Sequence, residues 1–337
     1  MGTRSSLIMR LGQFLIALAA LVVVAFVYLY AHDYDSWYRK RHGVLVQSTL
    51  ERVDHDSLSE KFWVSLQSSS GLTVRCGLLV PGHATQRYPA IILLGGKQTG
   101  RYAINYATDV RDAIVIAADY PYEPRGSYTL PRFLADAPAI RRALLDMVPS
   151  LMLIVDYLAQ RPDVDTNKLI LLGYSFGAPF VPAFISVDRR PTAVAMVYSG
   201  GNLFSLIRHN ARRYGSSLVS ELVAAIGGLL LRPLEPLRYV DRIAPIPLIM
   251  INGEEDQMIP RSNTMELYNH AREPKTLIWL PSKHVDPRNV ELTNLIVQTM
   301  RKELSRLGIV KQVSLERGES AGHQTPRATR RREELAH

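Results

Sequence analysis

A serine lies between two glycines in the stretch "LILLGYSFGAP", residues 169–179, directly after an apolar run. A strand, a Gly-x-Ser-x-Gly turn and a helix together form a nucleophile elbow, in which the serine side chain projects from a strained corner. Gly173 and Gly177 carry no side chains that would meet the neighbouring strand and helix. The pattern predicts that Ser175 is a nucleophile, which needs a base within hydrogen-bond reach and an acid to orient that base.

Candidates for the acid and the base follow the last two apolar runs of the chain. The stretch "PLIMINGEEDQMIP" carries Glu254, Glu255 and Asp256, and "LIWLPSKHVDP" carries His284. Turns that follow parallel strands meet at the carboxyl edge of the sheet, where open α/β sheets hold their sites. The other eight of the nine histidines lie before the elbow, in an insertion, in a helix-like segment or in the tail. His284 is therefore the expected base, while all three acids are candidates.

Short apolar runs and the segments between them predict the architecture that positions these residues. Two extended runs at 62–68 and 72–81, joined by Ser-Ser-Gly, predict a hairpin. Crossover helices are expected between the later runs, for example at 136–161 and 176–187. Together these predict an open, mostly parallel α/β sheet of eight strands with helices on both faces. The six runs expected to form parallel strands are residues 88–96, 113–121, 168–175, 193–201, 247–256 and 275–284.

One crossover, residues 201–241, is unusually long and predicts a helical cap insertion. It contains the apolar, helix-like stretch "SSLVSELVAAIGGLLL" after a segment that carries Arg208, Arg212 and Arg213. Two interpretations are compatible with this composition: a helical cap that packs on the sheet, and a lid that lines an acyl-binding pocket. Beyond the sheet, residues 311–337 have little apolar content and predict a disordered basic tail.

Residues 11–31 are uncharged over the length that a helix needs to cross a bilayer, and they predict an uncleaved transmembrane anchor. A cleavable signal peptide is the alternative, although the apolar run is longer than a usual signal. The positive-inside rule compares the Lys and Arg residues on the two sides of a membrane span, and here their numbers are nearly equal. The catalytic domain is expected on the extracytoplasmic side. The expected organisation is a segment 1–10, an anchor 11–31, a juxtamembrane linker 32–60, a catalytic domain 61–310 and a tail 311–337.

Composition excludes several classes of protein. The 337 residues, 47% of them hydrophobic, suffice for one large domain with a buried core. The net charge of +9 is spread along the chain without an aromatic-rich basic stripe, so no nucleic-acid partner is expected. A single cysteine, Cys76, forms no internal disulfide and is expected to pack in a strand. The sequence does not indicate an oligomeric state.

The chain resembles the serine hydrolases of the α/β-hydrolase superfamily, and most of all their dienelactone-hydrolase and peptidase-related esterase branches. The similarity covers roughly residues 60–305 and is strongest in "VDYLAQRPDVDTNKLILLGYSFGAP", which matches the helix, turn, strand and elbow of those families. In "INGEEDQMIP", the family's spacing from glycine to acid selects Asp256. The stretch "SKHVDP" departs from the family, because Lys283 replaces the small residue usual before the histidine.

The resemblance also implies an oxyanion hole. In this superfamily the backbone N–H after the nucleophile and one from an earlier strand-end loop bind the developing charge; here these would be Phe176 and Lys97. The glycines of "LLGGKQTGR" are not a phosphate loop, because Gly96-Lys97-Gln98 lacks the required Ser or Thr. No spacing typical of metal ligands occurs, and no cofactor is expected.

The sequence thus predicts a membrane-anchored enzyme that hydrolyses a small-molecule or lipid-like carboxylic ester, or a thioester, through an acyl-Ser175 intermediate. Two alternatives are a serine peptidase of the same fold and a membrane-anchored scaffold that has lost activity. A peptidase is less favoured because the chain has no room for a large additional gating domain. A silent scaffold is less favoured because Ser175, Asp256 and His284 are all present.

Overall fold

The computed structural model describes most of the region that the sequence assigns to the catalytic domain. Most of the predicted anchor 11–31, and all of segments 1–10 and 311–337, lie outside the described residues. Within the part of the chain that is described, no helix combines the length and apolar character that crossing a bilayer requires. The described residues are 12–13, 16–17, 20, 23–24, 27–28, 31–55, 59–82, 86–96, 99–107, 110–121, 130–213 and 215–310.

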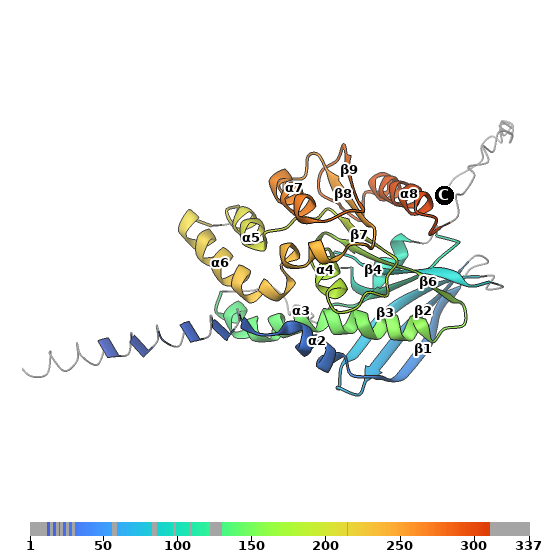
Figure 1. Ribbon diagram of the computed structural model, residues 1–337, viewed down its shortest axis with the longest axis horizontal. Coiled ribbons are helices and arrows are strands. Elements are labelled where there is room, and N and C mark those ends of the chain that lie inside the picture. Colours follow the sequence, from blue (N-terminus) through green and yellow to red (C-terminus); the bar gives the residue numbers. More distant parts are fainter. Residues whose placement is uncertain are drawn as a thin grey trace, which may run out of the picture.

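A nine-stranded sheet runs through the molecule in the order β1-β2-β3-β5-β4-β6-β7-β8-β9 (Figure 1). The first three strands pair antiparallel, and β3 pairs antiparallel with β5. The six strands β5, β4, β6, β7, β8 and β9 pair parallel with one another in that order. The strands are β1 Leu45–His55, β2 Ser59–Ser68, β3 Thr73–Pro81, β4 Tyr88–Leu94, β5 Ile114–Ala118, β6 Val164–Tyr174, β7 Ala193–Val197, β8 Leu248–Gly253 and β9 Lys275–Leu280.

The predicted number of eight strands was wrong, because β1 forms within residues 32–60, where the sequence predicted a linker. Ten of its eleven residues are exposed, since it is the terminal strand of the sheet and pairs only with β2. Its register against β2 shifts twice, between Leu45 and Gln47 and between Arg52 and Asp54. An exposed strand carries no apolar alternation from which it could be predicted.

Helices cover both faces of the sheet. One core lies under α2 (Tyr34–His42), α3 (Leu130–Ala159) and α4 (Phe180–Ile185), and includes the buried Cys76. The other lies under the 3₁₀ helix η1 (Gly100–Tyr106) and α8 (Val290–Arg306). The predicted crossover helices 136–161 and 176–187 correspond to α3 and α4. The inner parallel strands are thus largely buried on both faces, as their continuous apolar runs predicted, whereas the edge strand β9 is mostly only partly buried.

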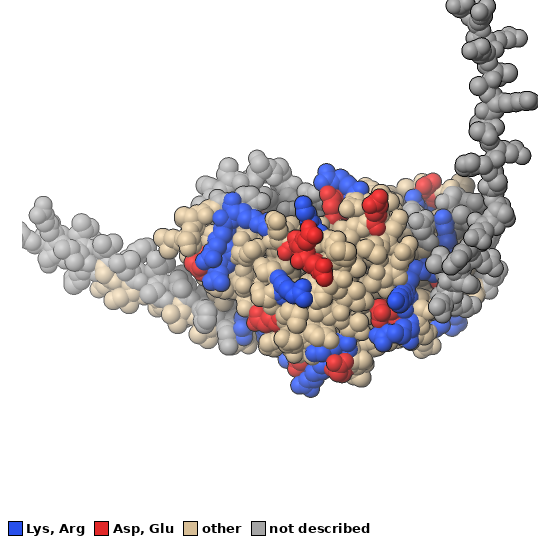
Figure 2. Space-filling model, turned by 90° about the horizontal axis from the view of Figure 1, so that it is seen from above, with Lys and Arg blue, Asp and Glu red and all other residues tan. Residues whose placement is uncertain are grey.

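Between β7 and β8 the chain forms α5 (Leu203–Ala211), α6 (Ser217–Leu230) and three short 3₁₀ turns, followed after β8 by α7 (Arg261–His270). Helices α5 and α6 pack against each other at one end of the molecule (Figure 1). Leu218 and Leu222 of α6 are 80% and 60% exposed. On the face shown in Figure 2, basic and acidic side chains are interspersed around a wide uncharged area.

Ion pairs attach α2 to the body of the domain. Arg41 pairs with Asp146 of α3 at 2.9 Å, and Asp156 of α3 accepts hydrogen bonds from His42 and Arg190, both at 2.7 Å. Burial alone would raise the pKa of Asp156, but the hydrogen bonds from His42 and Arg190 together lower it below its ordinary value. Asp156 is therefore held as a carboxylate between two positively charged or protonatable side chains.

Candidate active site

The corner between β6 and α4 carries Ser175. Strand β6 ends at Tyr174, a 3₁₀ turn spans Ser175–Gly177, and α4 follows. Ser175 has a φ of 49°, a left-handed conformation that is strained for a residue with a side chain. A Cβ at Gly173 would lie 2.7 Å from the carbonyl oxygen of Gly177, and one at Gly177 would lie 2.4 Å from that of Leu94. Only glycine fits at either position, which is what the sequence pattern predicted.

Three side chains from three separate loops form one hydrogen-bonded series. The Oγ of Ser175 lies 2.8 Å from Nε2 of His284, and Nδ1 of His284 lies 2.7 Å from Oδ2 of Asp256. The Asp256 side chain is 1% exposed and that of His284 is 16% exposed. The structure therefore brings together the three residues that the sequence singled out as nucleophile, acid and base.

Asp256 is distinguished from the two neighbouring glutamates by its position. Its Oδ1 accepts hydrogen bonds from the backbone N–H groups of Met258 and Ile259, at 2.7 and 3.0 Å. Both oxygens of the Asp256 carboxylate are thus used, one by the turn and one by His284. Glu254 and Glu255 are exposed, and among the described contacts neither reaches His284. The turn that follows β8 therefore presents one buried carboxylate to the histidine.

The loops after β8 and β9 are held against each other by backbone hydrogen bonds. The N–H of Glu254 donates to Leu280 at 2.8 Å, and the N–H of Glu255 donates to Ser282 at 3.0 Å. A Cβ at Gly253 would lie 2.5 Å from the carbonyl oxygen of Ser282, so the two loops approach closely at this glycine. The separation between Asp256 and His284 is therefore fixed by the backbone as well as by their side chains.

Tyr198, at the end of β7, also contacts His284, although sequence reasoning did not select it. Its ring packs edge-on against the imidazole with 5.5 Å between centroids, and its hydroxyl lies 2.5 Å from the Ser282 hydroxyl. Burial, with a smaller contribution from the negative charge of Asp256, raises the pKa of Tyr198. The only sequence signal was its place directly after an apolar strand, at the same edge as the other site residues.

The expected oxyanion-hole donors are only partly described. Phe176 follows the nucleophile in the elbow and is 37% exposed, whereas Lys97 lies outside the described residues. Two side-chain hydrogen bonds hold the turn before Lys97. The Tyr120 hydroxyl donates to the Gly95 carbonyl, and the Thr99 hydroxyl donates to the Gly96 carbonyl at 2.8 Å. Burial raises the pKa of Tyr120, which keeps its phenol protonated as a donor.

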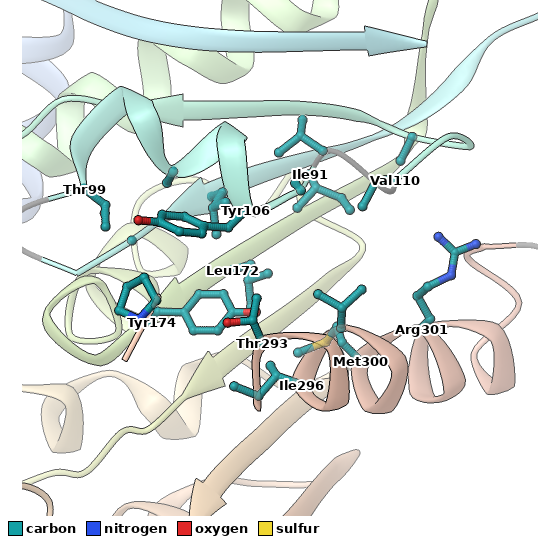
Figure 3. A pocket seen from close by; sticks show the side chains of 18 of the residues that line it. Ile91, Thr99, Tyr106, Val110, Leu172, Tyr174, Thr293, Ile296, Met300 and Arg301 are labelled. Carbon is teal, nitrogen blue, oxygen red and sulfur yellow. The ribbon is translucent and has the colours of Figure 1, made fainter. Parts of the chain in front are cut away.

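An apolar cavity opens beside Ser175 and continues between the sheet and α8 (Figure 3). Within the described part of the chain, none of its lining residues comes from α5 or α6. This cavity lies beneath α8 and η1, and the described helices of the insertion do not line it. The cavity therefore does not support the interpretation of the insertion as a lid that lines an acyl pocket. Among the described residues, no three His, Cys, Asp or Glu side chains are grouped so as to hold a metal ion.

Part of the chain matches a family model of serine hydrolases and is similar to curated bacterial proteins. Residues 142–296 match the family model described as "Serine hydrolase (FSH1)", a segment that contains Ser175, Asp256 and His284. The protein YfhR of Salmonella typhimurium strain LT2 is 30% identical over 150 residues, which are 44% of this chain and 51% of that protein. YfhR of Escherichia coli K12 is 30% identical over 133 residues, 39% of this chain and 43% of the relative. The chain thus spans about half the length of the curated relatives it matches.

Solved structures with the same fold include esterases. The acetyl xylan esterase of Paenibacillus sp. R4 superimposes with a TM-score of 0.57 at 17% identity, over 79% of this chain and 94% of that one. Acetyl xylan esterase 1 of Thermoanaerobacterium sp. JW/SL YS485 gives 0.58 at 16% identity, over 80% and 93%. The hypothetical protein PA2218 of Pseudomonas aeruginosa gives 0.54 at 17% identity, over 77% and 99%. At such low identity these similarities establish the fold.

Proposed function

We propose that the chain is a serine hydrolase that cleaves a carboxylic ester or thioester through an acyl intermediate on Ser175, a proposal supported by the match of residues 142–296 to a serine hydrolase family model. The observation that carries this proposal is the hydrogen-bonded series from Ser175 through His284 to Asp256, with contacts of 2.8 and 2.7 Å. A serine hydroxyl is a poor nucleophile at neutral pH, and this series supplies the base and the orienting acid that it needs.

In the first half of the reaction, Oγ of Ser175 attacks the substrate carbonyl carbon while Nε2 of His284 takes the hydroxyl proton. Asp256 accepts the Nδ1–H hydrogen bond, which fixes the histidine tautomer and stabilises the imidazolium that forms. The tetrahedral intermediate then collapses, the bond to the alcohol or thiol breaks, and His284 returns the proton to the leaving group. The product that departs is an alcohol or a thiol, and the acyl group stays on Ser175.

In the second half, water attacks the acyl-Ser175 carbonyl. His284 takes a proton from the water and then returns it to Oγ of Ser175, which releases the carboxylic acid. Two backbone N–H groups, those of Phe176 and Lys97, are proposed to bind the oxyanion in both halves. The position of Phe176 directly after the nucleophile supports its part, and losing one such donor typically costs about 3 kcal/mol of transition-state stabilisation.

The test uses a fluorophosphonate probe, which labels an activated serine, together with nitrophenyl ester hydrolysis. The wild-type chain should be labelled and active, and Ser175→Ala should lose both, with a decrease in turnover of about a millionfold. Ser199→Ala is the matched control, because Ser199 is buried just beyond the end of the neighbouring strand β7 and its hydroxyl donates to the Met196 carbonyl. A folded Ser175→Ala protein with full activity would contradict the mechanism.

Membrane attachment through residues 11–31, with the catalytic domain on the extracytoplasmic side, is part of the same proposal. The uncharged length of this run supports it. The described apolar side chains there are largely exposed, with Ile16 at 71% and Val24 at 64%. Alkaline carbonate should fail to extract the full chain from membranes, and protease added outside intact cells should digest the catalytic domain. Release by carbonate would refute the anchor, and full protection would refute the orientation.

A further inference from the structure

The cavity beside Ser175 is closed on one side by the sheet and on the other by α8 and η1. At the carboxyl edge of the sheet it is bounded by Gly95, Tyr174 and Val285. Figure 3 shows Ile296, Met300 and Arg301 of α8 along one wall, opposite Tyr106 and Val110. The cavity thus runs along the strands, from the nucleophile toward the amino edge of the sheet.

The lining residues on two elements give the approximate length of the cavity. Along β4 and the turn after it, the lining extends from Gly95 back to Ile91, four residues that span about 13 Å in a strand. Along α8 it extends from Thr293 to Leu304, eleven residues that span about 16 Å in a helix. The cavity volume is about 170 Å³. A cavity of that volume and that length is narrow.

The walls offer almost no polar group to a ligand. Of the described lining residues, only Asp112 and Arg301 are charged, and they pair with each other through two hydrogen bonds of 2.8 Å. The hydroxyl of Thr99 donates to Gly96, and that of Thr293 donates to Asn289 at 2.9 Å. These four polar side chains are thus satisfied within the protein. Apart from Ser175 and the phenols of Tyr106 and Tyr174, the other lining side chains are apolar, which favours an apolar group.

The Asp112–Arg301 ion pair lies toward the far end, where Leu304 and Val310 also line the cavity. Asp112 precedes β5 and Arg301 lies in the fourth turn of α8, with side chains 31% and 27% exposed. Their outer sides therefore face solvent, and their inner sides, together with the buried Met300, face the cavity. An apolar chain that entered at Ser175 would meet Met300 and the paired, partly solvated charges toward the end of its path, beside Leu304 and Val310.

We propose, building on the hydrolase function above, that this cavity binds the unbranched acyl chain of the substrate and that Met300 and the Asp112–Arg301 pair limit its length. The cavity volume indicates the size of the acyl group. An apolar cavity of about 150 Å³ in another protein binds benzene, whereas pockets for drug-sized ligands measure about 300–1,000 Å³. The preferred substrates are accordingly esters or thioesters of short to medium straight-chain acids. Branched and aromatic acyl groups are disfavoured by the narrow bore.

The experiment measures kcat/KM for nitrophenyl esters of straight-chain acids of increasing length, with the full chain in detergent micelles. For the wild type, kcat/KM should rise about fourfold with each methylene, the equivalent of about 0.8 kcal/mol, and then fall once the chain exceeds the cavity. Met300→Ala should move the optimum to longer chains. Val297→Phe, at a partly exposed lining position one turn earlier on α8, should move it to shorter chains.

Met147→Ala is the matched control, because Met147 of α3 is equally buried but lies in the core on the opposite face of the sheet. It should leave the optimum unchanged. If Met300→Ala does not fold, the Val297→Phe profile decides the question. An unchanged optimum in the folded variants, or an equal loss on every ester, overturns the acyl-chain assignment. A wild type that neither reacts with the fluorophosphonate probe nor cleaves any ester refutes the hydrolase proposal instead.

Discussion

The Tyr198 ring packs edge-on against the His284 imidazole, with 5.5 Å between the ring centroids, while the Tyr198 hydroxyl hydrogen-bonds Ser282. Tyr198 has a φ of 52°, so it shares the left-handed conformation of Ser175 on the neighbouring strand. Tyr198, which follows β7, thus contacts the loop that follows β9 through both its ring and its hydroxyl. It positions the histidine without taking part in the proposed proton transfers.

Tyr198→Phe should keep the ring contact and remove the hydrogen bond, which lowers kcat by about two- to tenfold because the His284 loop is held less firmly. Ser282→Ala removes the same hydrogen bond from the other side. Kinetics of the two single variants and the double variant test this: the double variant should lose no more than the larger single loss. Losses that simply add would show that the two hydroxyls act independently.

Asp256→Asn should lower turnover by about ten-thousandfold, because an amide neither fixes the required histidine tautomer nor balances the imidazolium charge. Glu254→Gln and Glu255→Gln are the controls, since both side chains are exposed and follow the same strand. They should leave turnover within severalfold of the wild type. If either glutamine variant proved the more severe, the assignment of the acid would be wrong while the reaction class survived.

Gly177→Ala should destabilise the domain by about 1–3 kcal/mol or more, because the added methyl would lie 2.4 Å from the Leu94 carbonyl oxygen. Denaturant unfolding of the purified variant measures the loss. Gly96→Ala serves as the comparison, since a methyl there meets no atom within 4 Å. Equal unfolding midpoints for Gly177→Ala and Gly96→Ala would mean that the elbow relaxes freely around an extra carbon.

The lowered pKa of Asp156 predicts a pH-dependent contribution to stability. The unfolded chain binds this proton more readily than the folded one, so the contribution is present above the ordinary aspartate pKa of about 3.9 and is lost as pH falls through the lower folded value. Asp156→Asn should therefore be less stable than wild type near neutral pH, and the difference should shrink below about pH 4. Urea unfolding across this range measures it.

The control for this prediction is Asp54→Asn. The Asp54 side chain is 64% exposed and lies 3.5 Å from Lys61, a surface pairing that contributes little. It should change stability only slightly at any pH. A difference between Asp156→Asn and wild type that stayed constant on acidification would assign the loss to altered packing instead of charge.

The meeting of Ser175, Asp256 and His284 could be predicted from the sequence because each follows an apolar run that forms a parallel strand. Parallel strands end at a common edge, so residues far apart in the chain are brought together once the apolar runs are recognised. The acid and the histidine were expected to follow the serine in the chain, so few other residues remained as candidates for the acid and the base. The glycines of the elbow were equally predictable, since their neighbours leave no room for a Cβ.

Other features could not be predicted in this way. The apolar positions of α8 recur every three or four residues whether the helix packs tightly on the sheet or leaves a cavity beneath it. Whether Met300 fills space or borders it depends on β4, β5 and η1 together. Tyr198 likewise shows no local pattern, because its role depends on the loop that holds Ser282, 84 residues later.

Strand β1 is one of the two outermost strands of the sheet and pairs with β2 alone among the described strands. A terminal strand presents unpaired backbone groups that can template growth of a shared sheet between molecules. In β1 the charged side chains Glu51, Arg52 and Asp54 and two register irregularities lie along that border. Such features bend the strand and place charges where an incoming strand would have to align. These features disfavour fibrous self-assembly through the edge of β1, although Val46, Leu50 and Val53 are exposed on this strand.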